Sequence, residues 1–181
     1  TISTIMMLAA PILIIATGGM ICERSGVTNV GLDGLMSIGA CTAAIVHQLL
    51  EAAGVGRISL TVALLAAALV SMLISVLHAI ASVDLKSDQT ISGTGINLLA
   101  TGITVFVCQR IYGTDRSTEF KMGMVKDGIG FYPTLYIAIV VVVLAWFILY
   151  KTPFGMHLRA CGEHPAAADS VGINVRRIRY I

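Results

Sequence analysis

The sequence is poor in charge. Only 12% of its 181 residues are Asp, Glu, Lys or Arg, whereas 56% are hydrophobic, and the mean hydropathy is +0.88. Soluble domains carry about 25% charged residues, so a soluble fold of this size would lack the polar surface to cover itself. The composition therefore predicts an integral membrane protein, with a buried subunit of a soluble complex as the alternative.

Signatures of catalysis, metal binding and nucleic-acid binding are also missing. The four cysteines are scattered without a C-x-x-C pair, and the four histidines lack H-E-x-x-H or other ligand spacing. No G-x-x-x-x-G-K-[ST] phosphate loop is present, so the chain is not itself an ATPase. The net charge is only +2, and basic and aromatic residues are not interleaved as nucleic-acid binding would favour. We expect a non-catalytic chain without a metal or cofactor, in which His47 and His78 are packed or at interfaces.

Five apolar stretches approach the length of about 20 residues that a helix needs to cross a bilayer. Their apolar runs do not alternate with polar residues, which argues against strands. We therefore expect an all-α polytopic bundle, with one segment either continuous or broken. The stretches are residues 2–22, about 30–50, 58–83, 90–112 and 133–150.

Basic residues indicate the direction of the chain in the membrane. Five of the twelve lie after residue 150, which places residues 151–181 in the cytoplasm and residues 1–150 in the membrane region. Residues 113–132 are then external and residues 84–89 internal. If every stretch crosses fully, the turn at residues 22–26 is cytoplasmic. If the first pair forms a re-entrant hairpin, that assignment fails.

The helix faces differ in the side chains that they carry. Stretch 133–150 is rich in Val and Ile without a small-residue face, so we expect it to contact lipid. Stretch 58–83 has a small residue at every fourth position, which predicts a packing seam. The seam consists of Ala63, Ala67, Ser71, Ser75 and Ala79.

Stretch 90–112 carries a polar face. Residues at spacings of four and three share one side of a helix, and polar side chains at membrane depth face the bundle or a watery cavity. Hydrogen bonding between helices and the lining of a translocation path both remain open. The face consists of Gly93, Asn97, Thr101, Thr104 and Cys108.

The stretch ICERSGVTNVGLDG interrupts two apolar segments with charges and glycines. A charge at the bilayer centre costs about 2.5–3.5 kcal/mol on insertion scales, and broken helices are a recurring way of building transporter sites. An ordinary interfacial turn is the alternative to a discontinuous helix beside a solute path. The residues that we expect near such a path are Asn29, Asp33, Gly93, Asn97 and Thr101.

The tail after residue 150 is too polar to cross a membrane, and Pro153 and Gly155 are expected to break the helix before it. Pro165 suits a first helical turn and Gly172 suits a helix end, which predicts a helix over residues 165–171. Asn174 would cap another helix starting at Val175. The short helix either docks into a groove on another protein or is a solvated connector. The chain ends as the next helix begins, and we expect it to be a fragment of a longer protein.

Three stretches carry a family resemblance: GGMICERSGVTNVGLDGLMSIGA, SDQTISGTGINLLATG and TPFGMHLRACGEHPAAADSVGINVRRIRY. In order and spacing they resemble permease subunits of bacterial ABC importers in the branched-chain amino acid and ribose permease superfamily, nearest the nucleoside-uptake subgroup. The resemblance implies a multi-pass inner-membrane subunit that pairs with a copy or a related permease. It also implies an extracytoplasmic solute-binding protein and a separate ATPase that docks on a coupling helix at residues 163–172.

The coupling residues implied by the resemblance are Gly162, Glu163, Pro165, Ala167, Ala168 and Gly172. The sequence departs from the family pattern at two positions. Asp33 stands where Glu is usual and keeps the charge, and His164 stands where Asn is common, which leaves the fit to the ATPase groove open there. An ion-coupled transporter would need paired acidic or His residues at mid-membrane, and only Asp33 qualifies. A purely structural membrane subunit is a further alternative.

Overall fold

The structure is a computed structural model that describes residues 2–56, 58–115 and 131–180. In these residues the regular structure is helical, and five helices are long and apolar enough to cross a membrane. They match the predicted stretches within two residues at each end, which confirms the all-α membrane fold. Residues 116–130, most of the loop predicted to be external, lie outside the described residues. The five are α1 (Ile2–Arg24), α2 (Leu32–Ala52), α3 with η1 (Ile58–Asp84), α4 (Gln89–Tyr112) and α5 (Pro133–Lys151).

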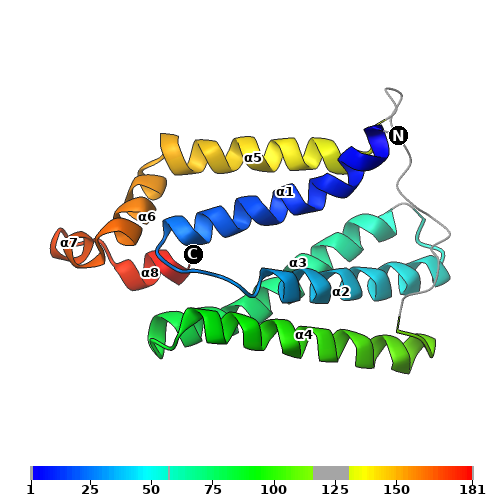
Figure 1. Cartoon of the computed structure of the whole chain (residues 1–181). Helices are drawn as coiled ribbons and strands as arrows, with labels where there is room; N and C mark the ends of the chain where they lie inside the picture. Colours follow the sequence, from blue (N-terminus) through cyan, green and yellow to red (C-terminus); the bar gives the residue numbers. More distant parts are fainter. Residues whose placement is uncertain (1, 57, 116–130, 181) are drawn as a thin grey trace. The chain divides into compact units, whose positions relative to one another are not determined.

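The chain divides into two compact units, each with its own packing. Unit 1 comprises Thr1–Asn29 and Met124–Ile181, and unit 2 comprises Val30–Gly123. Unit 1 contains α1 and α5 with the short helices α6 (Pro153–Glu163), α7 (Pro165–Ser170) and α8 (Val175–Tyr180), and unit 2 contains α2, α3 and α4 (Figure 1).

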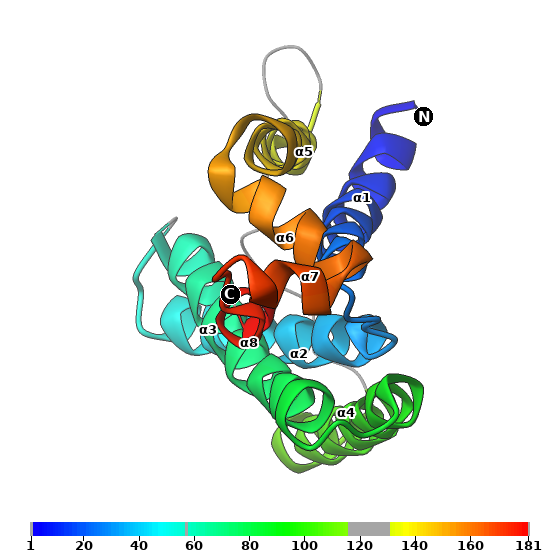
Figure 2. The same cartoon turned by 90° about the vertical axis from the view of Figure 1, so that its left-hand side faces the viewer.

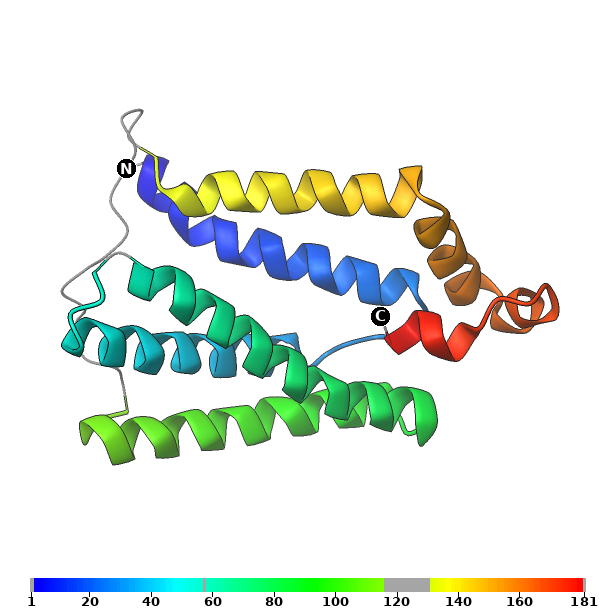
Figure 3. The ribbon, with the colours of Figure 1, turned by 180° about the vertical axis from the view of Figure 1, so that it is seen from behind.

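In unit 2, α2 packs against both α3 and α4 (Figure 3). Ala63 and Ala67 of α3 are buried, and the Ser71 hydroxyl donates to the Leu35 carbonyl of α2 at 3.1 Å. A Cβ added to Gly39 of α2 would lie 2.8 Å from Ser71 Oγ. The predicted small-residue seam is therefore confirmed at these positions as the contact of α3 with α2.

Two buried histidines join the helices of unit 2. His47 is 5% exposed, and its Nδ1 lies 3.1 Å from Ser59 Oγ at the start of α3. His78 is 3% exposed, and its Nδ1 lies 3.0 Å from Ser92 Oγ of α4. Both rings are thus packed and hydrogen-bonded, as predicted. Ser59 also donates to the Gly56 carbonyl and is fully buried, so this serine–histidine pair is structural.

In unit 1, α1 and α5 run side by side in the same direction (Figures 1 and 3). Small buried residues lie seven positions apart, at Ala10 and Thr17 of α1 and at Ala138 and Ala145 of α5, and Leu149 of α5 is buried as well. Seven residues are nearly two helical turns, so each pair lies on one face. The prediction that stretch 133–150 has no small-residue face was wrong, because two alanines among the branched residues suffice for close packing. The other faces of α5 are not covered by other helices of the described residues, as contact with lipid requires.

The tail begins with a helix that the sequence analysis missed. Pro153 and Gly155 were expected only to end the preceding helix, but α6 starts at Pro153, capped by the Thr152 hydroxyl, which accepts from the Gly155 N–H at 3.3 Å. A Cβ added to Gly155 would collide with the carbonyls of Ile148 and Leu149, so glycine allows the sharp corner. Figure 2 shows α6 running from the end of α5 toward α1.

Candidate functional site

The first candidate site is the connector between α1 and α2. Helix α1 ends in a Schellman motif: Gly26 has a φ of 81°, Gly26 N–H donates to the Glu23 carbonyl, and Val27 N–H donates to the Cys22 carbonyl. Residues 25–31 are not helical, and α2 begins at Leu32. The predicted interruption is therefore the non-helical connector of residues 25–31, which has turns at both of its ends.

The start of α2 is capped from another helix. Gly31 occupies the N-cap position and has no side chain to accept a hydrogen bond. Asn97 of α4 supplies the missing group, because its Oδ1 accepts from the Gly34 N–H at 2.8 Å. Its Nδ2 donates to the Val30 carbonyl at 3.0 Å. One amide thus satisfies a backbone group of the connector and a backbone group in the first turn of α2, which is what non-helical backbone needs away from water.

Glycines let the backbones of α2 and α4 meet at this point. A Cβ added to Gly93 would lie 2.8 Å from the Gly31 nitrogen, and one added to Gly34 would lie 2.9 Å from the Asn97 Cα. Such separations are too short for a side chain. Farther along the same contact, the thiols of Cys41 and Cys108 are close enough to interact electrostatically. The polar face of α4 therefore packs largely against α2.

The structure brings together only part of the predicted solute-path set. Gly93 and Asn97 meet the start of α2, as described. Thr101 is exposed one turn farther along α4 and donates to the Asn97 carbonyl of its own helix at 2.9 Å. Asp33 is exposed in the first turn of α2, and Asn29 is half-buried in the part of the connector that belongs to unit 1.

Sequence reasoning missed the partners of Asn97. Val30 and Gly34 were not among the candidates for the solute path. The available signal was a helix start with glycine at the N-cap, which leaves N–H groups that must find an acceptor elsewhere. That signal does not say which side chain supplies the acceptor.

The second candidate site is the loop formed by α6, α7 and α8. Helix α7 ends at Ser170, one residue before the predicted end, and Gly172 follows with a φ of 86°. The Ile173 N–H donates to the Ala168 carbonyl at 3.1 Å, which completes a second Schellman motif. The Asn174 side chain accepts from the Arg177 N–H at 2.9 Å and caps α8 as predicted.

The predicted coupling residues separate into outer and inner positions. Glu163, Pro165, Ala167 and Gly172 are exposed, whereas Ala168 is 4% exposed and packs inward. Gly162 also faces inward, because a Cβ there would collide with the Arg24 carbonyl at the end of α1. The outer positions are available to a partner protein. The inner positions, Gly162 and Ala168, pack against the rest of unit 1 and fix the position of the loop.

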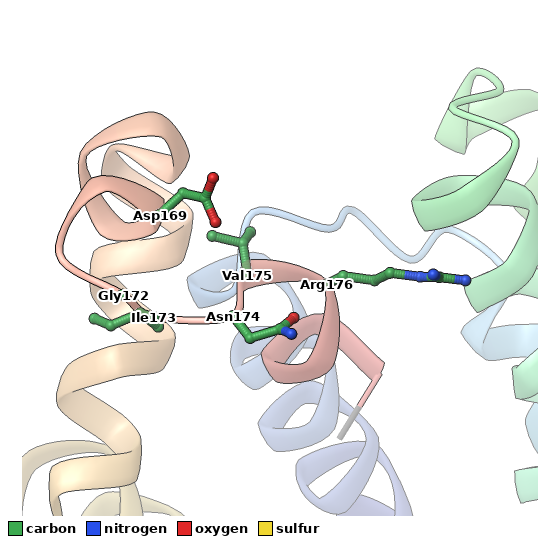
Figure 4. Close-up of a pocket in the computed structure, with 6 residues that line it drawn as sticks. All are labelled: Asp169, Gly172, Ile173, Asn174, Val175 and Arg176. Atoms are coloured by element: carbon green, nitrogen blue, oxygen red, sulfur yellow. The ribbon is translucent and has the colours of Figure 1, made fainter.

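An open hollow of about 410 Å³ lies between α7 and α8 (Figure 4). Asp169 stands on one rim, and Figure 4 shows Arg176 extended away from it. The hollow therefore has a carboxylate on the α7 side and a lining of both polar and apolar residues. Its lining residues are Asp169, Gly172, Ile173, Asn174, Val175 and Arg176. Within the described ranges, no group of three His, Cys, Asp or Glu side chains is placed to hold a metal ion.

The family model that matches this chain and the names of two similar proteins all describe transport permeases. The family model described as branched-chain amino acid transport system, permease component, matches residues 1–181. The guanosine ABC transporter permease protein NupQ of Bacillus subtilis is 44% identical over 96% of this chain and 59% of its own length. The nucleoside ABC transporter permease protein NupC of Lactococcus lactis is 35% identical over 99% of this chain and 61% of its own length. The chain thus spans about three fifths of these relatives. No solved structure matches it significantly.

Proposed function

Because the chain belongs to the branched-chain amino acid transport system permease family, we propose that it is the membrane-spanning permease subunit of an ATP-driven importer with a nucleoside-like solute. The names of the two relatives, which refer to guanosine and to nucleosides, support that solute class. The chain is a multi-pass protein of the plasma membrane. Residues 1–150 are its membrane region, and residues 151–181 are its cytoplasmic loop.

The observation that carries the ATP-driven part of the proposal is the construction of α7. A helix of six residues is marginal alone, but Ala168 packs inward and the Gly172 turn ends the helix, so α7 presents a fixed outer surface. Pro165 and Ala167 on that surface, with Glu163 at the end of α6, contact a separate ATPase subunit. The inward-facing Gly162 and Ala168 position α7, and the turn at Gly172 ends it while remaining exposed.

The remaining parts of the transporter follow from the family. A second permease, either a copy of this chain or a related one, completes the membrane path. An extracytoplasmic solute-binding protein delivers the solute, and the permease itself needs no cofactor.

The solute path runs beside the break before α2. Gly93 and Asn97 hold the broken backbone in place, and Asp33 and Thr101 present exposed polar groups nearby on α2 and α4. A carboxylate accepts hydrogen bonds and a hydroxyl both donates and accepts them, which suits the hydroxyls of a ribose. Asn29 belongs to unit 1 and is proposed as a path residue in its own right.

Reconstitution tests the proposed function. The full-length permease with its ATPase is placed in proteoliposomes that receive the solute-binding protein, and uptake of radiolabelled guanosine is measured with and without ATP. We expect ATP-dependent uptake that unlabelled adenosine inhibits and that leucine or ribose does not. Uptake that persists with a hydrolysis-deficient ATPase and disappears with a protonophore would favour an ion-coupled transporter and overturn the proposal.

A pair of substitutions tests the docking surface. Ala167→Arg places a long charged side chain on the outer face of α7, so we expect less ATPase to co-purify and uptake to fall. Ala167→Ser changes that face little and is the matched control, expected to behave as the unsubstituted protein. Normal co-purification and uptake with Ala167→Arg would remove α7 from the proposed interface.

A further inference from the structure

Arg179 of α8 bonds the ends of two other helices. Its Nε donates to the Ser25 carbonyl at 3.2 Å, and its Nη2 donates to the Cys161 carbonyl at 3.4 Å. Ser25 directly follows α1, and Cys161 lies in the last turn of α6. A single guanidinium therefore meets the C-terminal carbonyls of both helices, where the helix dipole favours a positive charge.

The two residues that accept these bonds are buried, and Arg179 itself is half-buried. Ser25 is 5% exposed and Cys161 is fully buried, so neither carbonyl has water as a ready substitute partner. The planar guanidinium presents several donors in a fixed fork, which lets it reach two carbonyls at once. A lysine ammonium at the end of a flexible stem does not match that geometry.

The backbones beneath Arg179 are in direct contact. A Cβ added to Gly26 would lie 3.1 Å from the Gly162 Cα and 3.0 Å from Arg179 Nη2. A Cβ added to Gly162 would collide with the Arg24 carbonyl. No side chain separates the end of α6 from the end of α1, so a displacement of one presses directly on the other.

The two helix ends that meet at this contact lead along the chain to different candidate sites. On one side, α6 leads through His164 into α7, the proposed docking helix. On the other side, Ser25 starts the connector that leads to Val30, whose carbonyl Asn97 holds. We propose that Arg179 is a positioning residue for transport, which couples the ATPase-docking loop to the connector before α2. This inference rests on the proposed function, because it requires an ATPase docked on α7.

If Arg179 were needed only for folding, replacing it would reduce assembly, ATP hydrolysis and import together. A coupling residue changes the amount of solute imported for each ATP hydrolysed. The ratio of import to hydrolysis in the reconstituted full-length complex is therefore the decisive measurement. The variants are Arg179→Gln, which removes both the positive charge and the planar set of guanidinium donors, and Arg179→Lys, which keeps only the charge. The matched control is Arg177→Gln, since Arg177 is an exposed arginine of the same helix.

We expect Arg179→Gln to assemble and to lower the import-to-hydrolysis ratio about tenfold, because hydrogen bonds to charged groups are the stronger ones in proteins. Arg179→Lys should give an intermediate ratio, and Arg177→Gln the unsubstituted ratio. An unchanged ratio in Arg179→Gln would overturn the inference. If Arg179→Gln does not assemble, Arg179→Lys decides, and an unchanged ratio there overturns it equally.

The same assay separates this inference from its premise. If the unsubstituted complex hydrolyses ATP but imports no nucleoside, the proposed function fails, and the inference fails with it. If the unsubstituted complex imports nucleoside and Arg179→Gln does so at the same ratio, only the role of Arg179 fails.

Discussion

The side chain of Asn97 acts as the N-cap that Gly31 cannot provide. It accepts from the Gly34 N–H at 2.8 Å and donates to the Val30 carbonyl at 3.0 Å. Because Asn97 belongs to α4, the position at which α2 begins is set by a different helix. A solute path at this break would depend on the contact between α2 and α4 for its shape.

Replacing Asn97 should therefore weaken both the fold and the uptake. Asn97→Ala removes the acceptor and the donor together, and loss of an N-cap alone costs about 0.5–2 kcal/mol. Asn97→Asp keeps the acceptor for the Gly34 N–H and adds a negative charge at the start of α2, which the helix dipole favours. We expect a smaller loss of thermal stability for Asn97→Asp, measured on the purified complex beside uptake.

Thr101→Ala is the control for that series. Its hydroxyl is exposed and bonds only the Asn97 carbonyl of its own helix among the bonds described, so thermal stability should change little. Unaltered stability in Asn97→Ala would contradict the capping role. Stability retained in Asn97→Asp with uptake lost would assign the amide a direct role in the solute path.

Glycine substitutions in α4 should have opposite effects depending on the face. A Cβ at Gly93 meets the Gly31 nitrogen at 2.8 Å and the Val30 carbonyl carbon at 3.1 Å, and backbone cannot move aside as a side chain can. Gly93→Ala should therefore destabilise by about 1–3 kcal/mol, as overpacking does. Thermal unfolding of the purified complex measures the effect.

Gly95 provides the matched control on the same helix. Nothing in the part of the chain that the structure describes lies within 4 Å of a Cβ added there, and alanine is favoured over glycine in a helix by about 0.5–1 kcal/mol. Gly95→Ala should be neutral or stabilising. Equal destabilisation by Gly93→Ala and Gly95→Ala would show that the close contact at Gly93 is not the cause of the lost stability.

The membrane helices and the caps of the tail could be predicted because their determinants are local. A bilayer requires a fixed length of apolar sequence, and each of the five runs has it. Pro165, Gly172 and Asn174 act within one turn of their own positions, so the bounds of α7 and α8 followed from neighbouring residues alone.

The missed features depend on contacts between distant residues. Asn97 bonds backbone groups 63 and 67 positions away, a pairing that one sequence does not specify. Gly155 was interpreted as a helix breaker, but it lies inside α6 and allows close contact with α5. Ala138 and Ala145 were overlooked among branched residues because only the position of α1 makes their face the buried one.

The corner between α5 and α6 should be intolerant of a side chain at Gly155. Gly155→Ala would place a Cβ against the carbonyls of Ile148 and Leu149, so α6 must tilt away and carry α7 with it. We expect lower thermal stability and reduced co-purification of the ATPase. Gly18→Ala, where no atom of the described residues lies within 4 Å of the added Cβ, should leave both measurements unchanged. Normal ATPase binding by Gly155→Ala would indicate that the corner does not set the position of α7.

The Cys161 thiol should titrate above its ordinary range. Burial raises its pKa from the ordinary value of 9.0, and the nearby Arg179 guanidinium opposes that rise without cancelling it. The folded state therefore binds the thiol proton more tightly than the unfolded state does. The stabilising contribution of the protonated thiol is fully present below a pH of about 9 and is lost as the pH rises through the folded pKa.

Alkylation can test this prediction directly, because the thiolate is the reactive form. In a full-length permease that keeps Cys161 as its only cysteine, N-ethylmaleimide should react slowly at pH 7–8 in the folded complex and rapidly after denaturation, as followed by mass spectrometry. If the loop stays closed in Arg179→Gln, losing the cation raises the thiol pKa further and slows alkylation. If the loop opens, exposure of the thiol accelerates it. Rapid alkylation of the unsubstituted complex at pH 7 would contradict a buried Cys161 and the closed contact that Arg179 makes over it.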